Sequence, residues 1–127
     1  MKLLVATTNQ GKASEIESVL FGMFEEIVSL SDLYSVRPPA EIGTTFQDNA
    51  RLKAAYYREK TGFAALADDS GLMVEALGGS PGVKTARFAP SAEEGISKIL
   101  SRLKHLAIPN KLQSRHAYFE CALCLDA

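Results

Sequence analysis

The pattern of apolar and polar positions changes period several times in the first half of the chain. A short apolar run at residues 3–6 leads into a polar loop, and apolar residues then recur at helical spacing over residues 16–23. Residues 26–30 form a second strand-like run, and residues 46–60 form a helix with one apolar face. Strands that alternate with helices are typical of α/β proteins, so we expect a mixed central sheet with flanking helices.

An apolar run at residues 63–67 ends in two adjacent carboxylates, Asp68 and Asp69. Its composition predicts a buried strand, which Gly62 separates from the preceding helix. Carboxylates at the end of such a strand are costly unless a cation, a proton or hydrogen-bond donors meet them; the alternative is a solvated turn. Adjacent strand residues point in opposite directions, so we expect one carboxylate to face a metal and the other to orient it or anchor the loop.

In the second half of the chain, the predicted helix that follows Ser91 looks architectural, whereas Arg87 is either an anion ligand or a surface charge. Another short apolar segment covers residues 72–77, and a loop rich in glycine and proline follows at residues 78–82. Ser91 and Glu94 form a capping box that predicts the start of a helix. Residues 117–125 are strongly strand-like.

Four residues of metal-binding type in this half carry no site. Cys121 and Cys124 lie in the predicted final strand, where residues three apart point to opposite faces, and no second Cys or His pair completes a zinc site. His105 and His116 have no partners at catalytic spacing, so we expect surface or packing roles for both. Neither a zinc site nor a redox pair is therefore expected.

Length and charge restrict the class of protein. A chain of 127 residues is the size of one domain, so we expect a single domain over residues 1–127. Its 14 basic and 15 acidic residues give a net charge of −1, which provides no footprint for nucleic acid or an anionic membrane. No apolar run approaches the roughly 20 residues of a membrane span, and the N-terminus does not resemble a signal peptide. A cytoplasmic protein is the default expectation.

The polar loop after the first predicted strand has the composition of a phosphate site. Such a strand-to-helix junction directs free backbone N–H groups and a helix dipole at one spot. The loop adds side-chain donors and one full positive charge. It is not a Walker A motif, because one glycine precedes Lys12 where that motif needs two and Ala13 follows where it needs Ser or Thr. Alternatively, Asn9 only caps the helix and Lys12 lies exposed on its first turn. The candidate phosphate ligands are Thr7, Thr8, Asn9, Gln10, Gly11 and Lys12.

Separated carboxylates suit a hard divalent cation. Mg²⁺ is commonly held by one or two carboxylates together with substrate phosphates, so Glu41, Asp68 and Asp69 are candidate metal residues. Glu41 is also explained as a partner of the dipole of the helix that follows it. Lys53 lies four residues after Asn49, and both either face the same cleft or form an exposed polar side.

These motifs, taken in order, resemble the Ham1 family of inosine and xanthosine triphosphate pyrophosphatases. The resemblance runs across nearly the whole chain, and the combination is much more specific than any single motif. It rests on Thr7-Thr8-Asn9 with Lys12 and Glu15, Glu41-x-Gly-x-Thr-Phe46, Asn49-Ala50-x-x-Lys53-Ala54, Asp68-Asp69-Ser70-Gly71 and Pro81-Gly82-Val83 through Ala86-Arg87-Phe88.

The resemblance implies Mg²⁺-dependent hydrolysis of ITP, dITP and XTP to the monophosphate and pyrophosphate. It implies that residues 7–12 hold the triphosphate and that Glu41 and Asp69 serve the metal. Asp69 would also act as the base on the attacking water, while Lys12 neutralises charge on the leaving group. Ser70 would contact the substrate, with Lys53 and Arg87 as secondary phosphate ligands. Family members are typically homodimers.

The sequence departs from the family pattern in one respect. Members continue well beyond this length, and their later part supplies a Gly-Phe-Gly-Tyr-Asp-Pro segment and a Ser-His-Arg segment that grip the base; neither occurs here. We therefore expect a shortened member whose second lobe is largely missing. The alternatives are a truncated, non-catalytic nucleotide-binding or assembly module of the same fold, and a related pyrophosphatase that acts on modified pyrimidine nucleotides.

Overall fold

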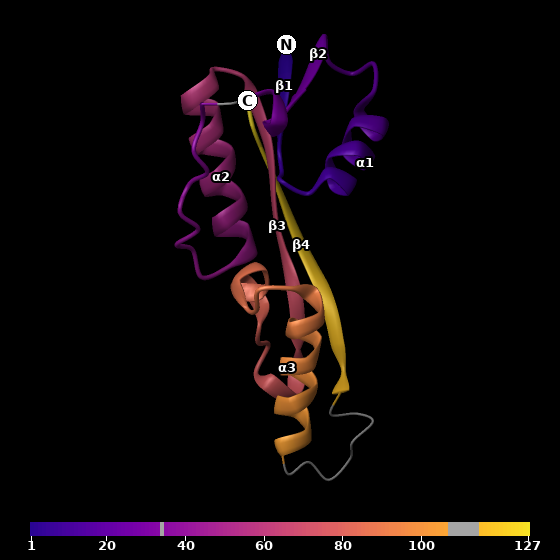
Figure 1. The fold of residues 1–127 in the computed structure, drawn as a ribbon. Coiled ribbons are helices and arrows are strands. Elements are labelled where there is room, and N and C mark those ends of the chain that lie inside the picture. The colour runs from indigo at the N-terminus through magenta and orange to yellow at the C-terminus, as the bar shows by residue number, and fades with distance from the viewer. Residues whose placement is uncertain (34, 107–114) are drawn as a thin grey trace. The chain divides into compact units, whose positions relative to one another are not determined.

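A computed structural model describes residues 1–33, 35–106 and 115–127 (Figure 1). The chain divides into two compact units, which are described separately. The first contains residues 1–69 and 122–127, and the second contains residues 70–121.

The strands form one four-stranded sheet. In chain order they are β1 (Lys2–Ala6), β2 (Glu26–Ser29), β3 (Ala64–Val74) and β4 (Ala117–Asp126), and their spatial order is β2-β1-β3-β4. β1 pairs in parallel with both β2 and β3. The end of β4 lies beside the start of β3, because Ala127 lines the same hollow as Ala64. The sheet is therefore mixed, as the sequence predicts.

Two helices cover opposite faces of the sheet in the first unit. These are α1 (Gln10–Leu20) and α2 (Phe46–Thr61) (Figure 1). One core cluster joins Leu4 and Ala65 to Tyr57 of α2, and the other joins Leu3 and Ala64 to the side of α1. Alternate residues of β1 and β3 thus enter two different cores, which explains why both strands are apolar throughout their paired segments. The expected α/β fold with flanking helices is confirmed.

β3 does not end at the acid pair, so that part of the sequence interpretation was wrong. The strand continues through Asp68 and Asp69 to Val74, and the apolar residues at 72–74 belong to it. Its pairing with β1, however, ends where Ala6 lies opposite Ala67. The carboxylates therefore lie just beyond the C-terminal end of β1. The strand continues because both side chains have partners on the helices, so no turn is needed to bring them to water.

The second unit contains the remaining elements. The Gly78 and Gly79 backbones have positive φ, as the breaker-rich loop there requires. A 3-10 helix follows at Gly82–Arg87, and α3 covers Ala92–His105. The Ser91 hydroxyl accepts a hydrogen bond from the Glu94 backbone N–H at 3.2 Å, which confirms the predicted cap.

The predicted helix stop is also confirmed. Gly62 ends α2 in the left-handed conformation, with φ of 74°. Cys121 is exposed, whereas Cys124 packs against the α2-side core, so the two side chains point to opposite faces of the strand as predicted. His105 and His116 lie at the surface. None of the helices in the described ranges is long and apolar enough to cross a membrane.

Candidate functional site

The two carboxylates of β3 point to opposite faces of the sheet. Asp68 follows the alternation of Ala64 and Leu66 toward α1, whereas Asp69 follows that of Ala65 and Ala67 toward α2. Both residues are buried, at 6% and 7% exposed. The predicted division between the two side chains is therefore present, and each has a different set of partners.

Asp68 meets the candidate phosphate loop. The Lys12 ammonium lies 2.6 Å from Asp68 Oδ2, and its side chain is only about one third exposed. Asn9 caps α1, because its side-chain oxygen accepts from the Lys12 backbone N–H at 3.1 Å. The capping alternative for Asn9 thus holds, but Lys12 turns inward instead of lying on an exposed first turn.

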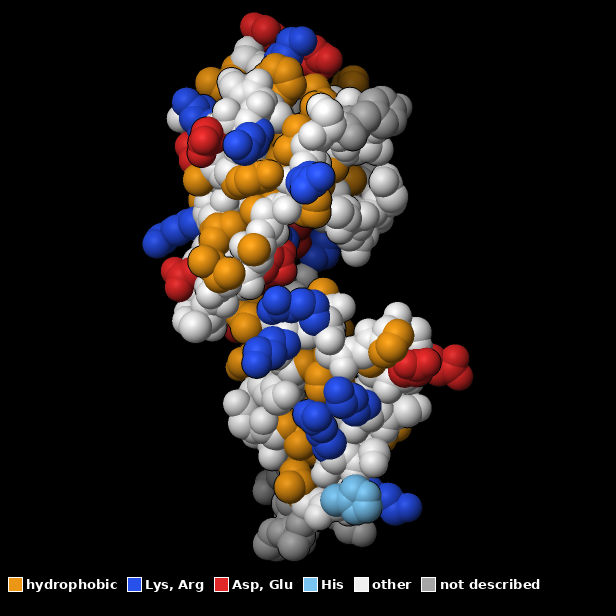
Figure 2. Space-filling model, turned by 60° about the vertical axis from the view of Figure 1, so that its left-hand side comes forward, with side chains coloured by type: hydrophobic (Ala, Val, Ile, Leu, Met, Phe, Trp, Pro, Cys, Tyr) orange, Lys and Arg blue, Asp and Glu red, His pale blue; other side chains and the backbone are white. Residues whose placement is uncertain are grey.

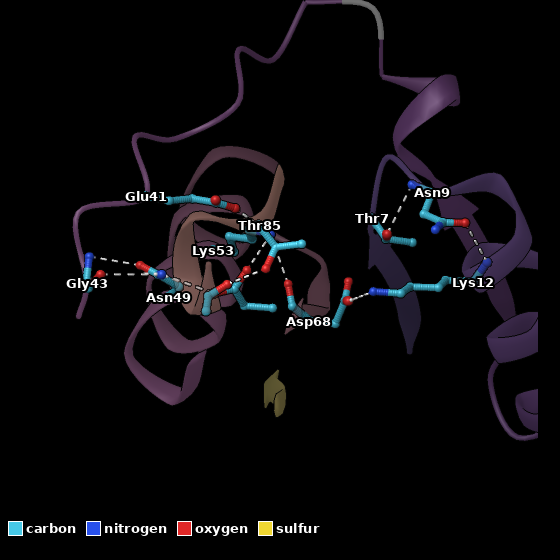
Figure 3. A network of polar contacts seen from close by, with 11 residues as sticks. Thr7, Asn9, Lys12, Glu41, Gly43, Asn49, Lys53, Asp68 and Thr85 are labelled. Atoms are coloured by element: carbon cyan, nitrogen blue, oxygen red, sulfur yellow. Dashed lines mark hydrogen bonds and ion pairs between the residues drawn. The ribbon is translucent and has the colours of Figure 1, made fainter. Parts of the chain in front are cut away.

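The rest of this loop is open to solvent. Thr7 is half-buried, and its hydroxyl accepts from the Asn9 backbone N–H at 3.2 Å. Thr8, Gln10 and Gly11 are exposed. Asn9 occupies the Lys12 backbone N–H, and the first turn of α1 contains no acidic residue, so the positive end of the helix dipole favours an anion there. The geometry suits a phosphate next to a lysine that Asp68 holds in place (Figure 3).

Asp69 is held by Asn49, which is completely buried on α2. The Asn49 amide nitrogen donates to Asp69 Oδ2 at 3.0 Å, while its oxygen accepts from the Gly43 backbone N–H at 2.8 Å. Asn49 therefore links the segment before α2 to the acid on β3. From the sequence, Asn49 could either face a cleft or lie on an exposed side of the helix. The signal for burial is that this polar residue lies between Phe46 and Ala50 on the apolar face.

Lys53 brings the third carboxylate to the site. Its ammonium lies 2.6 Å from Glu41 Oε1 and 4.0 Å from Asp69 Oδ1, and it donates to the Asp68 carbonyl oxygen at 2.9 Å. The exposed-surface alternative for Lys53 is wrong, because its side chain is about one fifth exposed. Glu41 and Asp69 thus flank one positive charge.

The charges of this cluster favour added cations. Three carboxylates and two lysines leave one negative charge in excess, which alone would repel a triphosphate. Burial raises the pKa of Asp69, and the carboxylates of Glu41 and Asp68 raise it further; the Asn49 hydrogen bond and Lys53 act in the opposite direction. Asp69 is therefore a carboxylate with a strengthened affinity for a proton or another cation.

The donor set is compatible with Mg²⁺. Among the described residues no three His, Cys, Asp or Glu side chains gather as a ready-made metal cage. Mg²⁺ does not need one, because it uses one or two carboxylates and completes its shell with water and substrate phosphates. Glu41 and Asp69 already converge on one cation, the Lys53 ammonium, which shows that the pair can share a positive charge.

Two sequence candidates belong to the second unit. Ser70 follows Asp69 on β3 and is half-buried. Arg87 ends the 3-10 helix and is exposed, where it lines a hollow together with Lys84.

Comparison with known proteins identifies the family. The model of the Ham1 family matches residues 3–127. A dITP/XTP pyrophosphatase of an Exiguobacterium strain is 45% identical over 98% of this chain and 62% of its own length. The dITP/XTP pyrophosphatase of Thermus thermophilus is 43% identical over 98% of this chain and 59% of its own. The chain thus spans about three fifths of the length of these curated relatives.

Solved structures agree with this result. A HAM1 protein from Coxiella burnetii matches with a TM-score of 0.83 at 33% identity, over 98% of this chain and 62% of that one. The Ham1 protein of Staphylococcus aureus matches with a TM-score of 0.82 at 32% identity, over 99% of this chain and 63% of that one. The chain therefore belongs to the Ham1 family.

Proposed function

We propose that the chain carries the phosphate- and metal-binding part of a nucleoside-triphosphate pyrophosphatase. Its substrates would be the deaminated purine nucleotides ITP, dITP and XTP, which yield the monophosphate and pyrophosphate. One observation supports this most strongly: Asp68 and Asp69 divide their contacts between the Lys12 loop and the Glu41–Lys53 pair. The dITP/XTP pyrophosphatases among the relatives give the substrate class.

The triphosphate would bind at the start of α1. Backbone N–H groups, the hydroxyls of Thr7 and Thr8 and the Lys12 ammonium supply donors and positive charge there. Lys12 would neutralise charge that develops on the pyrophosphate leaving group. Asp68 would keep Lys12 in position, since their 2.6 Å contact fixes a long and otherwise mobile side chain.

Asp69 would orient and deprotonate the attacking water. Its raised pKa brings the carboxylate closer to the range in which a general base is effective. Glu41 and Asp69 would hold Mg²⁺, which supplies positive charge to the phosphate oxygens when bound. Asp68 would contribute to this site through its backbone contact with Lys53. Ser70, Lys53 and Arg87 are secondary candidates for substrate contact.

Release of pyrophosphate tests this function. Purified chain is incubated with ITP, dITP or XTP, and with ATP and GTP as reference nucleotides, in the presence of Mg²⁺ or of EDTA. We expect release from the first three that depends on Mg²⁺. A full-length relative serves as the positive control. If the relative is active and this chain releases nothing from any nucleotide, catalysis by the chain is excluded. Preference for a modified pyrimidine nucleotide would overturn the proposed substrate class.

A second candidate is a non-catalytic module that binds nucleotide. It is favoured by the share of the relatives that the chain covers, about three fifths of their length. Calorimetry separates the two candidates: Mg²⁺-dependent binding of ITP without pyrophosphate release supports the module, whereas the absence of binding excludes both.

We also propose that the chain forms a homodimer and acts in the cytoplasm. β4 is an edge strand, and Leu123 and Leu125 on it are 62% and 53% exposed. Unpaired edges with apolar side chains commonly associate with another chain. Light scattering coupled to size-exclusion chromatography should report twice the monomer mass, and a monomer at micromolar concentration would refute the dimer.

A further inference from the structure

The second unit contains a hollow with basic walls. It has a volume of about 440 Å³ and is bounded by the 3-10 helix at Gly82–Arg87 on one side and by α3 on the other. Figure 2 shows Lys and Arg side chains gathered on one face of this unit, without an acidic side chain between them. The lining of the hollow includes Ser80, Lys84, Arg87, Phe88, Lys98 and Arg102.

Phe88 holds two of the cations at one wall. The Lys98 ammonium lies 4.3 Å from the centroid of the Phe88 ring, and the Arg102 guanidinium lies 5.0 Å from it. The Lys98 ammonium also donates to the Phe88 carbonyl oxygen at 3.0 Å. These contacts hold two long side chains in place, so less conformational entropy is lost when they bind a ligand.

The positive charge of the hollow is not balanced within the described residues. Among the described residues, no ion pair is formed by Lys84, Arg87, Lys98 or Arg102, in contrast to Lys12 and Lys53 of the first unit. Lys98 and Arg102 lie four apart on α3, and like charges at that spacing repel each other. A multivalent anion in the hollow would remove this repulsion.

We propose that this hollow binds the phosphate groups of a compact polyphosphate, such as inorganic pyrophosphate or triphosphate. Two guanidinium groups offer paired donors that match phosphate oxygens, and two ammonium groups add point charges. Ser80 adds a hydroxyl group to the lining. The same chemistry also recognises the triphosphate of a nucleotide, so the two sources are distinguished by experiment. The proposed site uses none of residues 7–12 and does not depend on the proposed hydrolysis. Arg87, named above as a secondary candidate for substrate contact, would serve this hollow instead.

Calorimetry with inorganic triphosphate tests the proposal. Every protein in this experiment is the full chain with Lys12→Ala, so that the loop at residues 7–12 contributes little to triphosphate binding. In this background we expect one triphosphate to bind per chain, with an affinity that falls steeply as salt rises. Adding Lys98→Gln and Arg102→Gln together should weaken binding at least about tenfold, the effect of about 1.4 kcal/mol. Lys104→Gln, an exposed lysine on the same helix outside the hollow, should leave binding unchanged.

Further measurements keep the proposal open to refutation. Circular dichroism must show that the double variant retains its helix content; if it does not, Lys98→Arg is used instead and should preserve binding because it keeps the charge. Folded double variant with unchanged affinity would overturn the proposal, as would absence of triphosphate binding in the Lys12→Ala protein. If ITP binds more than about tenfold tighter than inorganic triphosphate, phosphate groups alone are not the ligand. Tighter binding of single-stranded RNA at equal salt would show the same.

Discussion

The Lys12 ammonium and Asp68 Oδ2 lie 2.6 Å apart and connect the loop after β1 to the strand beside it. Asp68 is buried, and Lys12 is about one third exposed, so the pair places a positive charge at the border between protein and solvent. A lysine in this position can hold a phosphate without the conformational freedom of an unpaired surface lysine.

Replacing Lys12 by alanine should therefore weaken binding of Mg²⁺–ITP more than it affects the fold. We expect the dissociation constant measured by calorimetry to rise about tenfold to a hundredfold, equivalent to about 1.4 to 2.8 kcal/mol. Asp68 then loses its partner, so a stability loss of about 1 to 3 kcal/mol is also expected in urea unfolding. Lys104→Ala, a change at an exposed lysine of α3, is the control and should alter neither quantity. Unchanged affinity in Lys12→Ala would refute the phosphate role of the loop.

The buried charge of Asp69 predicts a specific dependence of stability on pH. The pKa of Asp69 is raised above its ordinary value of 3.8, so the native state binds this proton more tightly than the unfolded chain does. The contribution of Asp69 to the free energy of unfolding should therefore fall as pH rises from 3.8 through the raised pKa. Asp69→Asn lacks the ionisation. Its stability relative to the parent chain should increase across this window and then level off.

Urea unfolding at a series of pH values between about 3 and 8 measures this difference. Asp69→Asn should be at least as stable as the parent chain at neutral pH. The stability difference between Asp69→Asn and the parent chain is the quantity compared. If the variant loses stability relative to the parent as pH rises from acid to neutral, the direction of the pKa shift is contradicted.

Gly43 is required by the close approach of Asn49. A Cβ atom at Gly43 would lie 2.6 Å from Asn49 Oδ1 and 3.0 Å from the Cβ of Asp48. Gly43→Ala should displace the Asn49 amide and break its hydrogen bond with the Gly43 backbone N–H, which costs about 1 to 3 kcal/mol because Asn49 is buried. Gly95→Ala is the matched control.

A Cβ at Gly95 meets nothing closer than 3.7 Å, and alanine favours a helix interior by about 0.5 to 1 kcal/mol. Thermal unfolding should thus show a lower Tm for Gly43→Ala and an equal or higher Tm for Gly95→Ala. Equal Tm values for both variants and the parent chain would mean that Asn49 does not depend on this contact.

Asn49 itself offers a test of the Asp69 environment. In Asn49→Asp a carboxylate would replace the amide that donates to Asp69 at 3.0 Å, so two buried acids would face each other with no hydrogen between the facing oxygens. We expect a loss of about 3 kcal/mol or more at neutral pH that is partly recovered in acid, where one carboxyl group is protonated. Asn49→Asp that is fully stable at neutral pH would argue against the donor role of Asn49.

Local patterns in the sequence predicted the fold and singled out the residues of the candidate site. Apolar periodicity located the helices and the parallel strands, and strand alternation separated Asp68 from Asp69 before any contact was known. The extent of β3 could not be predicted in the same way. Whether a polar pair ends a strand depends on partners from elsewhere in the chain, here Lys12 and Asn49, and these contacts are tertiary.

The two central lysines show a similar distinction. Lys12 and Lys53 were recognisable as basic residues near helix starts or helix faces, but nothing local revealed that each was already paired with a carboxylate. The role of Phe88 was also invisible, because the cations that lie over its ring come from α3, ten or more residues further along the chain.

Turnover by the parent chain and Asp69→Asn, compared with Mg²⁺ and dITP, tests the central claim most directly. Pyrophosphate release is followed for both proteins, and binding of Mg²⁺–dITP is measured in parallel. We predict that the parent chain releases pyrophosphate and that Asp69→Asn is slower by about a hundredfold or more while it remains folded, as expected on loss of a general base. A folded Asp69→Asn protein that releases pyrophosphate at the parental rate would contradict the account.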